Sequence, residues 1–367
     1  MIGLALSGGG SRAMAFHLGC LRALNDLSVL QQISVLSTIS GGSVIGAYYA
    51  YTPQKSFAEF EADIRQILRV GLQHSIAWRL LQPSSLLGYA TQQCQQAFTS
   101  VGARIAGRIH IPAPRRNRTD RFYEVLRQKV FDDVQLEAPR RHDMEVVVGA
   151  CELRTGTAFR FSNKAIGGWR YGQALDATRD VAFAVAASAA YPFFLRCLDR
   201  TWTFSKAGAE TQKRILLTDG GVYDNLGISV LEPGRSADIT VHRYDCEHLI
   251  ICSAGIGQED GTSVPTAFLP RVNQAMSTIH RRVQDLAMQK LHGLKEAGKI
   301  KSFALPYLGQ QDHRLPIRPP DLMPRSAVIG YGTNFAPMAD EWINKLSRRG
   351  EQLTRVLIPY YMPDICT

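Results

Sequence analysis

The sequence predicts an α/β fold, and three observations support this. Short apolar runs at residues 2–6 and 33–39 indicate buried strands. Each run passes through glycines directly into a stretch with a helical pattern. The chain has 367 residues, of which 45% are hydrophobic and 31 are glycine, so it can bury a large core. We therefore expect one large domain, or one domain with an appendage.

The first strand leads into a glycine-rich segment, residues 8–12 (Gly-Gly-Gly-Ser-Arg), and then into an amphipathic helix at residues 14–27. Glycines between a strand and a helix let backbone N–H groups converge on an anion. One interpretation is an oxyanion hole in which Gly9 and Gly10 donate to a developing charge. The alternative is a dinucleotide site, because Gly8, Gly10 and Ala13 fit the G-x-G-x-x-A pattern.

The second strand favours the oxyanion hole. A dinucleotide site needs an acidic residue at the end of that strand, but the strand ends in Ser37-Thr38, and Asp26 lies in the last turn of the preceding helix. No Gly-Lys-Ser/Thr follows the glycines, which excludes a P-loop.

Ser40 is the candidate nucleophile. It stands between the strand at residues 33–39 and a helix at residues 44–51, followed directly by Gly41 and Gly42. Such a corner raises the hydroxyl above the sheet at a helix N-terminus, where an alkoxide is favoured. Thr38 occupies the position of the first glycine in G-x-S-x-G, so the fit is imperfect. Ser43 is a weaker candidate because no glycine lies two residues after it.

The pattern loosens over residues 52–119, which hold a helix at 56–70 and then apolar residues among prolines and glycines. We interpret this stretch as a cap or insertion over the site, either a flap that touches lipid or an ordinary helical excursion. Beyond it, residues 120–132 are expected to be helical, and residues 144–150 and 157–162 to be strands.

A helix of small residues is predicted from residue 181 to Pro192. The strand at residues 215–218 then leads into Asp219-Gly220-Gly221, which is either a plain turn or the position of a catalytic base. Further strands are expected at residues 239–241 and 249–252. A mainly helical C-terminal region, residues 265–367, should contain a cationic helix at 283–299 and a helix ending before Pro359.

Composition narrows the function classes. The seven cysteines are scattered without C-x-x-C spacing, which argues against a zinc site and a disulfide framework. The net charge of +10 favours an anionic partner, either phospholipid head groups or nucleic acid. No aromatic residues alternate with the arginines as a base-stacking platform requires, so no nucleic-acid partner is expected.

The N-terminus carries no signal-peptide pattern. Residues 28–54 lack charged residues, but glycines, glutamines and Pro53 argue against a membrane span. We expect a soluble, cytoplasmic protein that contacts an anionic membrane peripherally.

Four segments carry a family resemblance when taken together and in this order: residues 8–12, the Ser40 corner, Ala-Ser-Ala-Ala-Tyr-Pro at 187–192, and Asp-Gly-Gly at 219–221. Over residues 3 to about 228 the chain resembles the patatin-like phospholipase family. The resemblance implies a three-layer α/β/α sandwich with a mainly parallel central sheet. It also implies acyl-ester hydrolysis by a Ser-Asp dyad.

The resemblance assigns the nucleophile to Ser40 and the base to Asp219. It assigns the oxyanion hole to Gly8, Gly9 and Gly10, closed by Arg12, and the chemistry adds the N–H of Gly41 as a donor. Gly42, Gly220 and Gly221 are expected to support these groups. Neither a metal nor a cofactor is required, and the whole chain, residues 1–367, is expected to form one catalytic domain.

The predicted activity is that of a serine acyl hydrolase, of phospholipase A or lysophospholipase type, acting on membrane phospholipid or another acyl-ester lipid through an acyl-enzyme. One alternative is a lipid-binding or signalling module that has lost catalysis. Another is a Ser-His-Asp esterase, because several histidines follow Asp219 in the chain. They are His242, His248, His280, His292 and His313.

Overall fold

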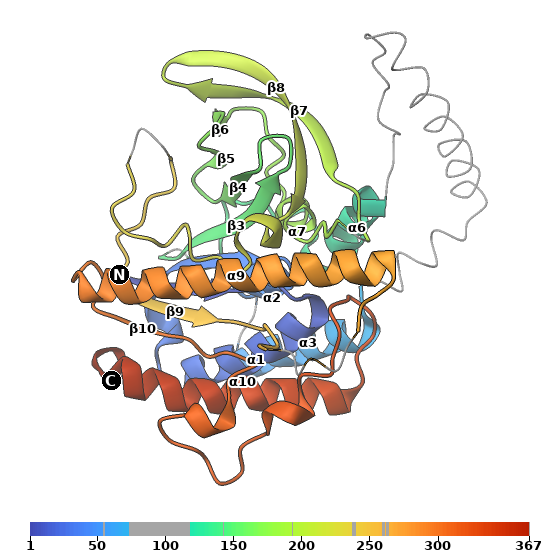
Figure 1. Ribbon diagram of the computed structural model, residues 1–367. Coiled ribbons are helices and arrows are strands. Elements are labelled where there is room, and N and C mark those ends of the chain that lie inside the picture. Colours follow the sequence, from blue (N-terminus) through green and yellow to red (C-terminus); the bar gives the residue numbers. More distant parts are fainter. Residues whose placement is uncertain are drawn as a thin grey trace.

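The structure is a computed structural model. It describes residues 1–53, 56–72, 118–141, 143–192, 194–236, 240–258, 261 and 264–366. Ten strands of this part of the chain form one sheet in the order β10-β9-β1-β2-β3-β4-β5-β6-β7-β8, with β3 also paired to β8. The two ends of this sheet are built differently, as Figure 1 shows.

One half of the sheet is parallel. Its strands are β10 (Ser302–Ala304), β9 (His248–Cys252), β1 (Ile2–Leu6), β2 (Ile33–Ile39) and β3 (Glu145–Glu152). β1 lies at its centre, with Leu4 opposite Leu36 on one side and Ile250 on the other. Buried on both faces, these strands are nearly continuous apolar runs, as parallel strands usually are. The carboxyl ends of β1 and β2, where the two glycine segments begin, therefore lie side by side.

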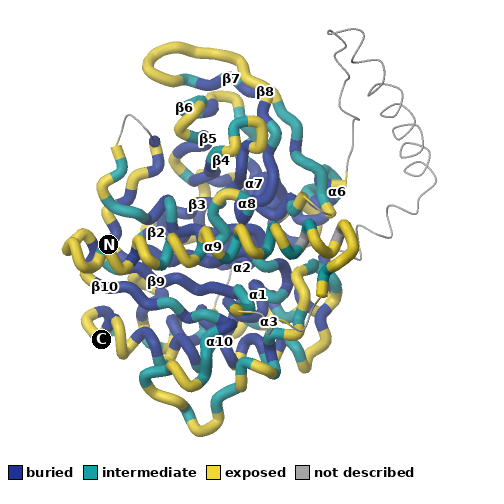
Figure 2. The backbone as a smooth tube through the Cα atoms, viewed as in Figure 1, coloured by how far each residue is buried: buried dark blue, intermediate teal, exposed yellow. Residues whose placement is uncertain are grey.

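Helices cover both faces of the parallel half. On one face, α1 (Gly10–Asp26) packs along α10 (Asp340–Tyr361), with α2 (Gly41–Tyr51) and α3 (Phe57–Val70) beside them. On the other face, a separate buried cluster joins β9 to α9 (Phe268–Glu296). Figure 2 shows dark, buried strands between these helices, whereas α9 is largely exposed.

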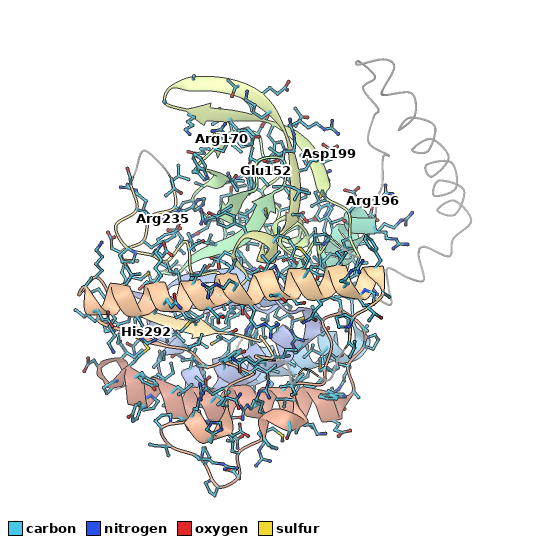
Figure 3. All side chains as sticks on the ribbon, in the orientation of Figure 1. Glu152, Arg170, Arg196, Asp199, Arg235 and His292 are labelled. Atoms are coloured by element: carbon cyan, nitrogen blue, oxygen red, sulfur yellow. The ribbon has the colours of Figure 1, made fainter. Side chains whose placement is uncertain are left out.

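The other half of the sheet is antiparallel and closes on itself. Its further strands are β4 (Thr157–Ser162), β5 (Ile166–Gly168), β6 (Gly172–Ala174), β7 (Leu198–Lys206) and β8 (Ala209–Asp219). β8 returns to β3, where Ala150 faces Asp219, so strands β3 to β8 form a closed ring. Figure 3 shows Glu152 in this half, and its buried carboxylate accepts the N–H of Leu216 on β8.

The prediction of a mainly parallel sheet is therefore wrong for this half. The cause is the β7–β8 hairpin, of which the sequence reading identified only residues 215–218. Lys206 pairs with Ala209 across a two-residue turn, and Ala207 and Gly208 both have positive φ, at 50° and 79°. This is the geometry of a type I′ turn, but Ala-Gly is not the Asn-Gly signal that reveals such turns in a sequence.

Several helices and strands begin or end at residues other than those predicted. α7 (Val181–Ser188) ends before Pro192, α9 begins well before residue 283, and α10 continues through Pro359. Residues 240 and 241 are not a strand, while residue 239 and most of the predicted insertion, residues 73–117, lie outside the described residues. α6 (Arg118–Leu126) follows that gap, and α8 (Gly221–Asp224) follows β8. None of the described helices is both long enough and apolar enough to span a bilayer.

Candidate active site

Ser40 stands at a strained corner between β2 and α2. Its φ of 52° and ψ of −118° lie in a region that non-glycine residues rarely occupy. The corner is closely packed, because a Cβ atom at Gly41 would lie 2.2 Å from the carbonyl oxygen of Gly10. At Gly42 a Cβ atom would lie 2.3 Å from the carbonyl oxygen of Leu6. Gly42 therefore lets α2 approach β1 closely beside Ser40.

The side chain of Thr38 fits at the corner because Gly46, on the facing helix, has no side chain. A Cβ atom at Gly46, one turn into α2, would lie 2.5 Å from Thr38 Cγ2. The Thr38 hydroxyl donates to the carbonyl of Val147 on the neighbouring strand at 3.3 Å. The missing glycine of the sequence motif is thus offset by a glycine on the opposite side of the strand–helix contact.

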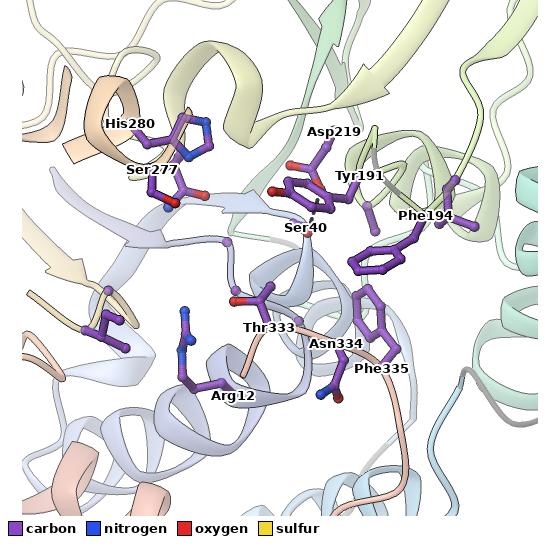
Figure 4. A pocket seen from close by; sticks show the side chains of 18 of the residues that line it. Arg12, Ser40, Tyr191, Phe194, Asp219, Ser277, His280, Thr333, Asn334 and Phe335 are labelled. Carbon is purple, nitrogen blue, oxygen red and sulfur yellow. Dashed lines mark hydrogen bonds between the residues drawn. The ribbon is translucent and has the colours of Figure 1, made fainter. Parts of the chain in front are cut away.

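The structure brings Ser40 and Asp219 into direct contact. Ser40 Oγ donates to Asp219 Oδ2 at 2.7 Å (Figure 4). Asp219 Oδ1 accepts the N–H of Gly221 at 2.7 Å. Ser40 is 6% exposed and Asp219 is 3% exposed. Burial raises the pKa of Asp219 to about 6, although the hydrogen bonds from Ser40 and Gly221 act in the opposite direction. This buried carboxylate is therefore a stronger base than an aspartate in water.

No histidine of the described residues is hydrogen-bonded to Ser40 or Asp219. His242 bonds to the carbonyl of Ala165, and His248 to the hydroxyl of Ser302. His280 lines the cavity beside the dyad, but Asp219 is already bonded to Ser40 directly. This arrangement favours a dyad over the Ser-His-Asp alternative.

Ser188, at the end of α7, is a site residue that the sequence interpretation missed. Its hydroxyl donates to the carbonyl of Gly149 at 2.5 Å and accepts the N–H of Ser40 at 2.9 Å. Ser43 Oγ lies 2.9 Å from the same hydroxyl. Ser188 thereby fastens the nucleophile corner to β3 and α7. The sequence signal that could have identified Ser188 is its position in the Ala-Ser-Ala-Ala segment of the family resemblance.

In the glycine-rich loop, one N–H group is hydrogen-bonded within the described part of the protein and two are not. Gly8 donates its N–H to the carbonyl of Asn225 at 3.0 Å, so the prediction that Gly8 is an oxyanion donor is wrong. A neighbouring carbonyl, supplied from a loop after β8, satisfies this group before any substrate can. The N–H groups of Gly9, Gly10 and Gly41 have no hydrogen-bond partner among the described residues. These three remain candidate donors.

A segment near the C-terminus holds the glycine loop in place. The N–H of Ser11 donates to the carbonyl of Asn334 at 2.7 Å. At Gly10, where φ is 60°, a Cβ atom would lie 2.3 Å from that same oxygen. Glycine is therefore required at this position both for its backbone conformation and for its lack of a side chain.

Arg12 joins the same two parts of the chain. Its guanidinium donates to the carbonyls of Ala254, at 3.1 Å, and Tyr331, at 3.0 Å. Burial lowers the pKa of Arg12 to about 10, and the group still carries its charge at neutral pH. The dinucleotide alternative gains no support here, because the carboxylate of Asp26 is paired with Arg355 on α10.

Gly220 and Gly221 support the base sterically. A Cβ atom at Gly220 would lie 2.2 Å from the carbonyl of Gly149, and one at Gly221 would lie 2.7 Å from Asn225 Oδ1. The described residues contain no cluster of His, Cys, Asp and Glu side chains that could hold a metal ion.

Ser40 and Asp219 open into a cavity of about 490 Å³. In Figure 4, Phe194 and Phe335 lie on one side of the dyad, and Ser277 and His280 of α9 lie on the other. The apolar and aromatic lining residues are Phe122, Tyr191, Phe194, Leu195, Ile256 and Phe335. The polar lining residues include Arg12, Arg118, Ser277, His280, Arg281, Gln284 and Tyr307. The cavity therefore suits a molecule with an apolar part and a polar part.

Comparison with known proteins shows the family and the fold of the chain. The family model described as patatin-like phospholipase matches residues 4–231. A search of curated proteins found no match. Among solved structures, human GIVD cytosolic phospholipase A2 is similar, with 13% sequence identity and a TM-score of 0.57 over 97% of this chain and 58% of the human chain.

The same human enzyme in complex with methyl gamma-linolenyl fluorophosphonate gives a TM-score of 0.53 at 13% identity, over 97% of this chain and 57% of that chain. At this level of identity the two structures show a shared fold. The present chain spans less than two thirds of the length of the human enzyme.

Proposed function

Because the chain belongs to the patatin-like phospholipase family, we propose that it is a serine acyl hydrolase of the phospholipase A or lysophospholipase type, cleaving carboxylic esters of lipids. The observation that carries this proposal is the 2.7 Å hydrogen bond from Ser40 Oγ to Asp219 Oδ2 at the wall of a partly apolar cavity. A nucleophile in contact with its base is the geometric requirement for covalent acyl transfer.

In the acylation step, Asp219 Oδ2 takes the proton of Ser40 as Oγ attacks the ester carbonyl. The carbonyl oxygen gains a negative charge, which the unpartnered N–H groups of Gly9, Gly10 and Gly41 stabilise. Removing one such donor typically costs about 3–4 kcal/mol of transition-state stabilisation. The tetrahedral intermediate then collapses, and the leaving alcohol takes the proton from Asp219.

In the deacylation step, Asp219 takes a proton from water, whose oxygen attacks the carbonyl of the acyl-enzyme. The same N–H groups stabilise the second oxyanion, and Ser40 recovers its proton from Asp219 as the fatty acid leaves. The raised pKa of Asp219 supports both steps, because it reduces the difference in pKa between the carboxylate and the hydroxyl group that it deprotonates.

The cavity supports a lipid substrate. Its apolar side can hold an acyl chain, and its polar side, with the charged guanidinium of Arg12, can hold a head group. The net charge of +10 favours anionic membranes as the source of that lipid. Hydrolysis of mixed liposomes should therefore increase with their anionic lipid content and decrease with salt. A rate indifferent to both would contradict this preference.

A fluorophosphonate probe tests the nucleophile. Stoichiometric labelling of the wild-type protein at Ser40, found by peptide mass spectrometry, is expected, and Ser40→Ala should remain unlabelled. Ser43→Ala provides the matched control, and it should retain labelling. Labelling at another residue would overturn the assignment.

The base is tested separately by Asp219→Asn, which should lower kcat by at least about 10³-fold. If this variant kept full esterase activity, the dyad would be wrong. A lipidomic comparison of membranes incubated with wild type and Ser40→Ala would then identify the lipid class.

A further inference from the structure

α9 has two faces with different surroundings. Ser277, His280 and Gln284 line the catalytic cavity, and further along the helix Leu291 is buried against the second core cluster. An ion pair between Lys290 and Glu232 holds the same part of the helix. These contacts fix the rotation of α9, and therefore fix which residues it presents outward.

The outward face carries an apolar stripe. Phe268, Ile279, Val283 and Leu286 are 69%, 57%, 43% and 48% exposed. At 3.6 residues per turn these four side chains fall within an arc of about 60°, roughly opposite the residues that line the cavity. The stripe extends for about 27 Å along the helix. Figure 2 shows this helix as mostly exposed across the front of the molecule.

Cations lie beside the stripe. Arg271 and Arg282 fall on one edge of it, both are exposed, and neither forms an ion pair with a described residue. Asp285 is the one acidic residue between Phe268 and Leu286. A helix with an apolar stripe and arginines at its edge is suited to the boundary between head groups and acyl chains of an anionic bilayer.

The cavity lies on the opposite side of α9 from this face. α9 lines the cavity through Ser277, His280 and Gln284, so a surface that contacts its outer face is separated from the cavity by one helix diameter, about 10 Å. Phe194, which lines the cavity across the dyad from α9 (Figure 4), is 58% exposed, so the cavity wall also reaches the surface there.

We propose that the exposed face of α9, defined by Phe268, Ile279, Val283, Leu286, Arg271 and Arg282, binds the protein to the surface of an anionic phospholipid bilayer. This inference deepens the proposed function and rests on it, since it names the surface that brings the cavity to its substrate.

A second copy of the chain fits this face less well. In an antiparallel two-fold symmetric contact, the same edge of each helix would face its counterpart. The edge that carries Arg271 and Arg282 would then meet an identical cationic edge, which is unfavourable. An anionic bilayer instead complements both the apolar stripe and the arginines.

A matched pair of variants tests the proposal. Ile279→Ser/Arg282→Gln removes one apolar and one cationic group from the α9 face. Ile317→Ser/Arg318→Gln makes the same two changes at exposed residues on the loop between β10 and α10, where Ile317 is 61% exposed. Binding is measured by co-sedimentation with vesicles of phosphatidylcholine, with and without phosphatidylglycerol.

We expect the α9 variant to bind the anionic vesicles at least about tenfold more weakly than wild type, and the loop variant to bind within about twofold of wild type. Both should hydrolyse a short-chain soluble ester at the wild-type rate. Equal binding by the two variants would overturn the proposal, as would failure of the wild-type protein to bind anionic vesicles. A change in oligomer mass without a change in vesicle binding would assign the face to a second copy.

The two proposals fail in different ways. If the wild type neither hydrolyses the soluble ester nor reacts with a fluorophosphonate, the proposed function is wrong, whatever the vesicles show. If the soluble ester is hydrolysed but the α9 variant binds vesicles normally, only the present inference is wrong.

Discussion

In the proposed mechanism Asp219 is the base, and its burial affects both its basicity and the stability of the fold. It has to be buried to be a useful base, because in water its carboxylate would be too weak to accept the proton of a serine hydroxyl. Burial without a cation beside it also means that its ionised form is disfavoured in the folded protein. The same environment that prepares the base therefore costs folding free energy.

The activity should show this pKa directly. Only the ionised form of Asp219 can accept the Ser40 proton, so kcat/KM should fall below a pH of about 6, by about tenfold per pH unit. The measurement is a pH profile with a soluble ester. An acidic limb near pH 4 would show that Asp219 is not desolvated in the free enzyme.

The stability cost gives a second prediction, for Asp219→Asn. The folded pKa of about 6 is above the ordinary value of 3.8, so this group favours folding below about pH 4, and that contribution is lost as the pH rises through 6. The difference corresponds to about 3 kcal/mol. Asparagine carries no charge, so we expect it to raise the free energy of unfolding at pH 8 by up to about 3 kcal/mol.

Urea titrations of wild type and Asp219→Asn at pH 8 and pH 4 make the comparison, with pH 4 as the control condition at which little difference is expected. Equal destabilisation at both pH values would show that hydrogen bonding, and not charge, sets the role of Asp219 in folding.

At the scale of elements, the contact between β2 and α2 positions Ser40, the proposed nucleophile. It depends on a pair of positions, because Thr38 fills the strand side and Gly46 leaves the helix side open. Neither residue touches Ser40 or Asp219 through a hydrogen bond, so their effect on the site is through packing alone.

Gly46→Ala should therefore destabilise the protein. Its Cβ atom would lie 2.5 Å from Thr38 Cγ2, and overpacking of this kind costs about 1–3 kcal/mol, more than the roughly 1 kcal/mol that alanine contributes to helix propensity. Thr38→Ser removes Cγ2 and keeps the hydroxyl. In urea titrations the double variant should recover most of the loss; strictly additive effects would contradict this contact.

The elements that position the nucleophile could be predicted from the sequence because their signals are local. An apolar run, a serine and two glycines define β2, the Ser40 corner and α2 without any knowledge of the rest of the chain. The β7–β8 hairpin could not be predicted in the same way, because residues 210–214 are exposed and polar and its turn lacks the usual residues.

In the glycine-rich loop, the sequence could not predict which N–H groups are free. Three adjacent glycines look equivalent in the sequence, but only contact with Asn225, far along the chain, separates Gly8 from Gly9 and Gly10. Ser188 was missed for a related reason: its partners on β3 and at Ser40 are brought together by tertiary structure alone.

At the scale of the whole molecule, the C-terminal region completes the core. α10 packs directly on α1, and the two helices approach so closely that a Cβ atom at Gly19 would lie 1.7 Å from the carbonyl of Ser347. Arg12 and Ser11 are bonded to the loop that precedes α10. The segment matched by the family model therefore does not contain all the contacts that shape its own glycine loop.

A chain that ends at residue 231 should for this reason fail to fold cooperatively. It would expose the apolar face of α1 and lose β9, the partner of β1 in the sheet. Thermal unfolding followed by circular dichroism tests this expectation, and co-expression with residues 232–367 serves as the control. A sharp transition from the short chain alone would contradict it.

Some N–H groups around Ser40 are hydrogen-bonded to described residues and others are not, so amide hydrogen exchange can test which of them bind the oxyanion. The amides of Gly8 and Ser40 are bonded in the free protein, whereas those of Gly9, Gly10 and Gly41 are not. In the proposed mechanism, reaction with a fluorophosphonate places a charged oxygen against the N–H groups of Gly9, Gly10 and Gly41 only. The deuterium uptake of Gly9, Gly10 and Gly41 should slow in the adduct, while that of Gly8 and Ser40 stays constant, so the isotope pattern would map the oxyanion hole amide by amide; new protection at Gly8 would refute this assignment.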